Sequence, residues 1–232
     1  MIDFYYAGTP NGLKVRLFFA ETGLEHRVVR VDLGKGDQFR SEYLAISPNN
    51  KIPAIVDHAP RDGAGPLALF ESGAILLYLA DKCGQLLPTQ LRARLDVTQW
   101  LFWQVGGLGP MAGQIGHFNV FAPEQVPYAI DRYTREVNRL YGVLDRRLAD
   151  RDFIAGDFSV ADIATYPWIV PYEAHGQNLA DHPHLKRWFE AIRARPATQQ
   201  AYEGVQDTYT KSSTPLSEEE RRILFGSGGV KK

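Results

Sequence analysis

The chain of 232 residues contains a single cysteine, Cys83. One cysteine excludes an intrachain disulfide, and it leaves no Cys-x-x-Cys pair or Cys/His cluster with the spacing of a zinc site. We therefore expect neither a disulfide-stabilised scaffold nor a bound metal. Cys83 falls near the end of a predicted helix, and we interpret it as buried or incidental.

The sequence also lacks an excess of charge and a long apolar run. Its formal net charge is −1, so nothing favours nucleic acid or an anionic membrane as a partner. The longest apolar runs, such as residues 74–80, are far shorter than the ~20 residues of a membrane-spanning helix. The first residues lack the basic-then-apolar pattern of a secretory signal. We predict a cytoplasmic protein that binds neither nucleic acid nor membrane.

Residues 1–84 alternate between strand-like and helix-like patterns. Aromatic and β-branched residues predict strands at 2–7, 27–33, 53–57 and 67–70, and apolar residues at helical spacing predict helices at 13–23, 38–46 and 71–84. The order is β-α-β-α-β-β-α. Because a helix connects the first two strands, they should be parallel. The turn-rich residues 59–66 should join the last two strands as a hairpin.

From residue 85 the sequence predicts helices only. Apolar faces indicate helices at 91–118, 123–148, 183–195 and 197–202, and another that begins at Ser159. Glycines and Pro110 should kink the first of these. Ser159 and Asp162 have the spacing of a capping box, which we interpret as a folding signal without chemistry. The fold class is α/β plus all-α, with domains at 1–84 and 85–204 and a partly disordered tail at 205–232.

Ile52 and Pro53 stand where a polar, turn-prone segment meets the third strand. A proline cannot donate to a sheet ladder, and a cis-proline usually lies in a tight turn. In that geometry the backbone N–H and C=O of Ile52 are turned outward, where an extended peptide could pair with them. The alternative is an ordinary start of a strand.

Three short motifs resemble those of the cytosolic glutathione transferase family. They are Asn50 to Ala54, Phe70 to Ile75 and Phe158 to Asp162, in this order across an α/β unit and a helical region. Residues 6–12, 32–39 and 99–111 are similar to the bacterial nu-class branch. The resemblance covers residues 1 to about 202. It implies an N-terminal thioredoxin-like domain, a C-terminal helical bundle, and a homodimer in which the helical domain of one subunit faces the thioredoxin-like domain of the other.

Glutathione has two carboxylates, one amine and one thiol, and the sequence offers partners for each. Ser72 and the neighbouring backbone N–H groups begin a helix, where an anion such as the γ-glutamyl carboxylate is favoured. Glu71 would pair with the α-amine. Ile52, placed by Pro53, would pair through its backbone with the cysteinyl unit. The alternative for Ser72 is a plain N-cap.

Three further residues are predicted to contact glutathione. Gln38 and Lys51 would reach its glycine carboxylate or its backbone, and the alternative for both is a solvated surface position. The resemblance implies that Arg132 contacts a carboxylate of glutathione. Whether Arg132 serves its own or the partner subunit's site is open, and an exposed helical arginine is the alternative.

The thiol end of the predicted site contains no cysteine, so the reactive sulfur must come from glutathione. The hydroxyl of Thr9 and the amide of Asn11 could donate to its thiolate at the start of a helix, and such contacts lower a thiol's pKa. Tyr5 and Tyr6 lie inside the first strand and are interpreted as structural. Thr9 could instead be an ordinary N-cap.

The resemblance to the nu-class branch, whose members act as glutathione-dependent disulfide-bond reductases, implies the same activity here, on a small or exposed disulfide. Glutathione would be the co-substrate, with one or two molecules, or glutathione disulfide, in each site. Trp100, Phe102 and Trp103 either line the open side of the pocket or pack in the core. The first alternative is a transferase that conjugates electrophiles or reduces hydroperoxides. The second is a non-enzymatic regulatory module that binds glutathione.

Overall fold

The computed structural model describes residues 1–205 and 217–226. Of the tail at 205–232, which we predicted to be partly disordered, residues 206–216 and 227–232 lie outside the described part of the chain. Within the described tail, α10 spans Glu218–Phe225, and Ser217 and Glu220 close a capping box at its start.

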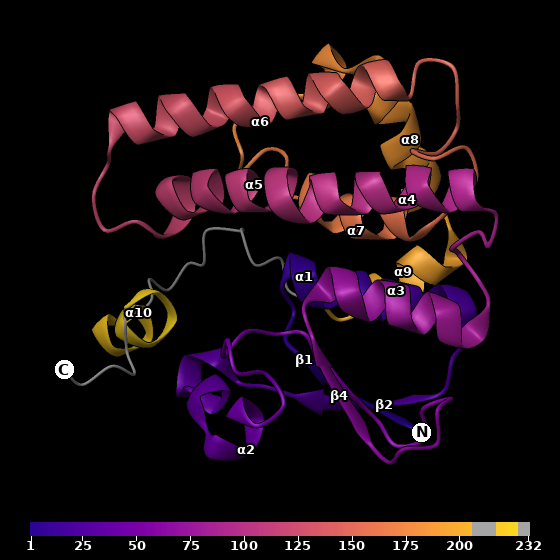
Figure 1. The fold of residues 1–232 in the computed structure, drawn as a ribbon. Helices are drawn as coiled ribbons and strands as arrows, with labels where there is room; N and C mark the ends of the chain where they lie inside the picture. The colour runs from indigo at the N-terminus through magenta and orange to yellow at the C-terminus, as the bar shows by residue number, and fades with distance from the viewer. Residues whose placement is uncertain (206–216, 227–232) are drawn as a thin grey trace.

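A four-stranded mixed sheet forms the base of the molecule (Figure 1). Its strands are β1 (Ile2–Tyr6), β2 (His26–Arg30), β3 (Ala54–Asp57) and β4 (Leu67–Phe70), in the order β2-β1-β3-β4. β1 and β2 are parallel, whereas β3 is antiparallel to both β1 and β4. The predicted parallel pair and the predicted hairpin are therefore confirmed.

Two helices lie between this sheet and the helical region: α1 (Pro10–Thr22) and α3 (Ser72–Cys83) (Figure 1). The predicted helix at 38–46 is wrong in extent. It divides into the 3-10 turn η2 (Asp37–Phe39) and the one-turn helix α2 (Ser41–Leu44), preceded by η1 (Leu33–Lys35). Arg40 separates η2 from α2 because its backbone is extended, with φ −68° and ψ 143°. Tyr43 of α2 packs on Tyr5 and closes the other face of the sheet.

The helix predicted at 91–118 is present as one helical stretch, and it is interrupted at the predicted glycines by a π-helical turn. α4 (Leu91–Trp103) passes through a π-helical turn, η3 (Gln104–Leu108), into α5 (Gly109–Gly116), which ends in a second π turn, η4 (His117–Phe121). The glycines and Pro110 thus mark a π turn, a feature often found at functional sites.

The remaining helices complete a bundle above α1 and α3 (Figure 1). They are α6 (Pro127–Arg147), α7 (Val160–Ile169), the 3-10 turn η5 (Leu179–Asp181), α8 (Pro183–Arg193) and α9 (Pro196–Tyr202). The predicted capping box of Ser159 and Asp162 is present at the start of α7. Among the described residues, no helix is both long enough and apolar enough to cross a membrane.

α1 is the element that joins the two halves, because it packs on α3 beside it and on α7 and α9 of the bundle. Its buried side chains Val15, Leu17 and Phe18 belong to one continuous core. Gly12 allows the first turn of α1 to lie against the end of β1, because a Cβ atom there would stand 2.2 Å from the carbonyl oxygen of Ala7. This close approach places Thr9 and Asn11 at the boundary between the halves.

Candidate functional site

Thr9 is the N-cap of α1, with Pro10 following as the first helical residue. Its Oγ1 accepts a hydrogen bond from the backbone N–H of Gly12 at 3.4 Å. The predicted capping alternative is therefore present, although the contact is long. A hydroxyl that accepts can still donate, and no described residue accepts the Thr9 proton. Capping and donation to a ligand are compatible at this residue.

Asn11 is fixed by a residue far away in the sequence. The indole Nε1 of Trp168, on α7, donates to Oδ1 of Asn11 at 3.0 Å. Because an indole N–H only donates, the atom that it meets must be the amide oxygen, and this settles the orientation of the amide. The Nδ2 hydrogens of Asn11 have no acceptor among the described residues, so they remain available to a ligand.

Two glycines of α5 pack against the ring of Trp168. A Cβ atom on Gly109 or on Gly113 would lie 3.4 Å from this ring. The start of α5 therefore forms part of the wall against which Trp168, the partner of Asn11, packs.

The start of α3 supplies the second part of the site. Glu71 is the N-cap and has φ +70°, a conformation that non-glycine residues seldom adopt. Ser72 is the first helical residue and is buried, and its side chain makes no capping bond. The alternative of a plain N-cap at Ser72 is therefore wrong. Its Oγ accepts instead from the ammonium of Lys14 at 3.2 Å.

Lys14 is buried between the two halves of the molecule and was missed in the sequence analysis. Its Nζ also donates to Oε1 of Gln104, in the π turn η3, at 2.6 Å. Burial is the main cause that lowers the pKa of Lys14 to about 7, against the opposing charge of Glu71. Helical spacing could have indicated that Lys14 is buried, because Lys14 shares its face of α1 with the apolar residue Phe18, one turn later.

Ile52 and Pro53 are joined by a cis peptide bond. The preceding residue is held firmly, because the carbonyl oxygen of Lys51 accepts from Tyr43 Oη at 2.7 Å and from Ser47 Oγ at 2.9 Å. The side chain of Lys51 is exposed. No described residue hydrogen-bonds the backbone of Ile52, so its N–H and C=O remain open to an extended ligand.

Gln38 and Arg132 have different surroundings from those expected. Gln38 is buried, so the alternative of a solvated surface position is wrong. Its Nε2 donates to the carbonyl oxygen of Leu33 at 3.2 Å. Its Oε1 has no hydrogen-bond partner among the described residues. Arg132 is exposed on α6, which lies across α5 from the sheet domain (Figure 1). Among the described residues, no hydrogen bond or ion pair joins Arg132 to Thr9 or Ser72, and its role stays a prediction.

The exposure of the side chains bears on two other interpretations, those of the aromatic residues of α4 and of Cys83. Phe102 is 62% exposed and therefore does not pack in the core, whereas Trp100 and Trp103 are partly buried against it. Cys83 is half-buried at the end of α3, and its Sγ contacts the carbonyl oxygen of Ala80. Among the described residues, no group of three His, Cys, Asp or Glu side chains could hold a metal ion.

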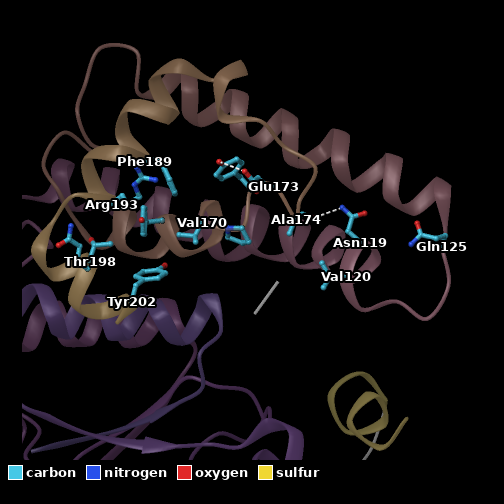
Figure 2. Close-up of a pocket in the computed structure, with 14 residues that line it drawn as sticks. Asn119, Val120, Gln125, Val170, Glu173, Ala174, Phe189, Arg193, Thr198 and Tyr202 are labelled. Atoms are coloured by element: carbon cyan, nitrogen blue, oxygen red, sulfur yellow. Dashed lines mark hydrogen bonds between the residues drawn. The ribbon is translucent and has the colours of Figure 1, made fainter. Parts of the chain in front are cut away.

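Two hollows lie near these residues. One, of about 820 Å³, reaches Gly8 and Thr9 between the ends of β1 and β2 and Gly204. The other, of about 910 Å³, lies in the helical bundle and extends from Asn119 and Gln125 to Thr198 and Arg193 (Figure 2). None of the predicted site residues lines the larger hollow. The position of Thr9 therefore favours the smaller one as the approach to the site.

Family comparisons agree with this architecture. Residues 2–81 match the family described as "Glutathione S-transferase, N-terminal domain", and residues 108–196 match "Glutathione S-transferase, C-terminal domain". The chain belongs to the glutathione transferase family. This confirms the predicted family and fold class.

Three relatives of this glutathione transferase are informative. The disulfide-bond oxidoreductase YfcG of Escherichia coli (strain K12) is 58% identical over 202 residues, covering 87% of this chain and 94% of YfcG. A glutathione transferase from Burkholderia graminis, solved with two glutathione molecules bound per subunit, is 43% identical with a TM-score of 0.83, and 88% of each chain is covered. A third, from Pseudomonas putida, was solved with one glutathione disulfide per subunit. It is 40% identical with a TM-score of 0.83, covering 88% of this chain and 92% of that one.

Proposed function

We propose that this glutathione transferase is a glutathione-dependent disulfide-bond reductase in which bound glutathione supplies the redox thiol. The observation that carries this proposal is the bond from Trp168 to Asn11, because it commits the Asn11 amide to donate at the N-terminus of α1 beside Thr9. No cysteine lies there. The similarity to a disulfide-bond oxidoreductase supports the same reaction.

Thr9 and Asn11 act on the sulfur of glutathione. Two donors and the partial positive charge of a helix N-terminus favour a thiolate over a thiol, whose ordinary pKa is about 8.5. The thiolate attacks one sulfur of the substrate disulfide, forms a mixed disulfide and releases the other sulfur as a thiolate, which takes up a proton. A second glutathione thiolate attacks the glutathione sulfur of the mixed disulfide. This releases the second substrate thiol and leaves glutathione disulfide.

The remaining predicted residues bind the tripeptide. The Ser72 hydroxyl and the first N–H groups of α3 take the γ-glutamyl carboxylate, and exposed Glu71 takes the α-amine. The open backbone of Ile52, set by Pro53, pairs with the cysteinyl unit. Lys51 reaches the glycine carboxylate, and the unpartnered Oε1 of Gln38 accepts from an amide N–H of the tripeptide. Relatives with two glutathiones or with glutathione disulfide support a site for both molecules of the reaction.

We also propose a homodimer in the cytoplasm, where glutathione is kept largely reduced. One helix presents an apolar face that suits a second copy of the chain: Leu91, Leu95 and Phe102 of α4 are 68%, 57% and 62% exposed. Their spacing of four and seven residues places them on one side of the helix. In such a dimer Arg132 would serve the partner subunit's site.

The test is a comparison of three substrates with the purified protein and glutathione: a model disulfide, a chlorinated aromatic and a hydroperoxide. We expect a disulfide rate far above background and above the other two. Strong conjugation or peroxide reduction with a background disulfide rate would favour the transferase alternative. Binding of glutathione without turnover of any substrate would favour the regulatory module.

A further inference from the structure

Lys14 has an unusual environment. Of the lysines and arginines in the described residues, it is the only buried one. Its two hydrogen-bond partners, Ser72 Oγ and Gln104 Oε1, are neutral. Burying an ammonium is costly unless an opposite charge compensates it. The other end of α3 shows the usual solution, because Lys82 pairs there with Asp57 at 2.8 Å.

The charged groups around Lys14 do not compensate it fully. Glu71, at the start of α3, is the one described residue whose charge shifts the pKa of Lys14, and it makes no ion pair with Lys14. The helices α7 and α9 also pack on α1. Their ionisable groups are Asp162, Tyr166 and Tyr202, and none of these contributes to the shift; Asp162 is engaged with Ser159 and Trp188. The ammonium therefore lacks a close anion.

Ser72 connects this buried charge to the ligand. Because an ammonium only donates, Ser72 Oγ must be the acceptor in its bond with Lys14. Its own proton then points elsewhere, and no described residue accepts it. The hydroxyl lies at the first residue of the 12-residue helix α3, where the free N–H groups also favour an anion.

We propose that Lys14 is a positioning residue for glutathione, an inference that rests on the proposed function. Its ammonium donates to Ser72 Oγ, so that the hydroxyl proton of Ser72 faces the γ-glutamyl carboxylate. The bound carboxylate in turn compensates the buried positive charge of Lys14. Gln104 keeps the ammonium in place from the helical domain.

Proton uptake on binding follows from this arrangement. Without ligand, burial lowers the pKa of Lys14 to about 7, so the amine is mostly neutral at pH 8. A carboxylate on Ser72 favours the charged form and raises this pKa. Binding at pH 8 therefore takes up a proton, and affinity falls roughly tenfold between pH 7 and pH 8.5.

The experiment is calorimetric titration of the full chain with S-methylglutathione, which has no ionisable thiol. Titrations at pH 8 in phosphate and in Tris, whose ionisation enthalpies differ, measure the protons taken up. We expect an uptake approaching one proton for the wild type. Lys14→Met should lose this uptake, bind about tenfold more weakly at pH 7 and raise the KM for glutathione with little change in kcat. Lys14→Arg, which stays charged, should bind without uptake and without pH dependence in this range.

Lys186→Met, at an exposed position of α8, is the matched control and should behave as the wild type. If the wild type binds without taking up a proton, or if Lys14→Met keeps the uptake and the affinity, the role of Lys14 is refuted while the proposed function stands. If the wild type does not bind S-methylglutathione, both proposals fail. The wild-type titrations decide the matter even if Lys14→Met does not fold.

Discussion

The indole Nε1 of Trp168 donates to Oδ1 of Asn11 at 3.0 Å, and the two residues are 157 positions apart in the sequence. The bond joins α7 of the helical bundle to the first turn of α1. A residue of one domain thereby determines the chemistry that a residue of the other can offer.

Trp168→Phe tests this relationship, because phenylalanine keeps a ring against α5 but cannot donate to Asn11. The Asn11 amide would then be free to turn its oxygen toward the thiolate. A hydrogen bond of this kind contributes about 1–1.5 kcal/mol, so we expect kcat for disulfide reduction to fall roughly tenfold. Steady-state kinetics with a model disulfide measures this. Trp103→Phe removes a similar indole from α4 and should leave kcat unchanged; an equal loss in both variants would contradict the assigned role of Trp168.

Asn11→Asp removes the hydrogen-bond donor of residue 11 but keeps the oxygen that accepts from Trp168. Aspartate still accepts from Trp168, but it presents a negative oxygen in place of the N–H₂ group. Repulsion should raise the thiol pKa of bound glutathione and lower kcat by about a hundredfold. The ultraviolet absorbance of the thiolate, recorded against pH, reports the pKa directly. Asn11→Ala should lose less activity than Asn11→Asp, and unchanged disulfide reduction in Asn11→Ala would remove Asn11 from the mechanism.

Leu95→Glu combined with Phe102→Glu tests the proposed dimer. Two carboxylates on the exposed apolar face of α4 should prevent a second copy from packing there. We expect light scattering to give a dimer mass for the wild type and a monomer mass for the double variant. Ala93→Glu, at an exposed position two residues from Leu95 and so on the other side of the same helix, should remain dimeric. A wild-type monomer, or a double variant that stays dimeric, would argue against this interface.

Asp162 gives a prediction for stability against pH. Burial raises its pKa to about 6, from 3.8, although it accepts bonds from Ile154, Ser159 and Trp188. Because the folded pKa is above the unfolded one, the folded state binds the proton more tightly. Ionisation of Asp162 between pH 4 and pH 6 therefore reduces the free energy of unfolding, by about 3 kcal/mol for this group.

Asp162→Asn removes this dependence, and it also costs stability at every pH because an amide cannot accept all of these bonds. Urea unfolding of both proteins between pH 4 and pH 7 measures the difference. The advantage of the wild type over Asp162→Asn should shrink as the pH rises. An advantage that grows with pH would show that the folded pKa of Asp162 is lowered and not raised.

The parts of the fold that local patterns encode could be predicted from the sequence. Strand and helix periodicities specified the order of strands and helices along residues 1–84, and the spacing of Ser159 and Asp162 identified the start of α7. Arg40, whose extended backbone divides the predicted helix at 38–46, could not be foreseen, because its neighbours have ordinary helical propensity.

The site was predicted only where short motifs carry it. Immediate neighbours in the sequence are enough to single out Thr9, Ser72 and Pro53 as candidates. They are not enough for Trp168 and Lys14, because the partners of these residues, Asn11 and Gln104, lie 157 and 90 positions away in the sequence. Phe102 is a related case, because an apolar residue on a helix has the same sequence pattern whether its side chain is buried in the core or exposed, as it is here.

The bonds from Lys14 to Gln104 and from Asn11 to Trp168 have a consequence for protein engineering. A chimaera that joins residues 1–84 of this chain to the helical region of a relative would inherit Lys14 and Asn11, but it would keep the orientation of these two side chains only if the new region supplied an amide and an indole at the same places. The two halves are therefore not interchangeable parts, and Gln104 and Trp168 must be transferred together with the first domain.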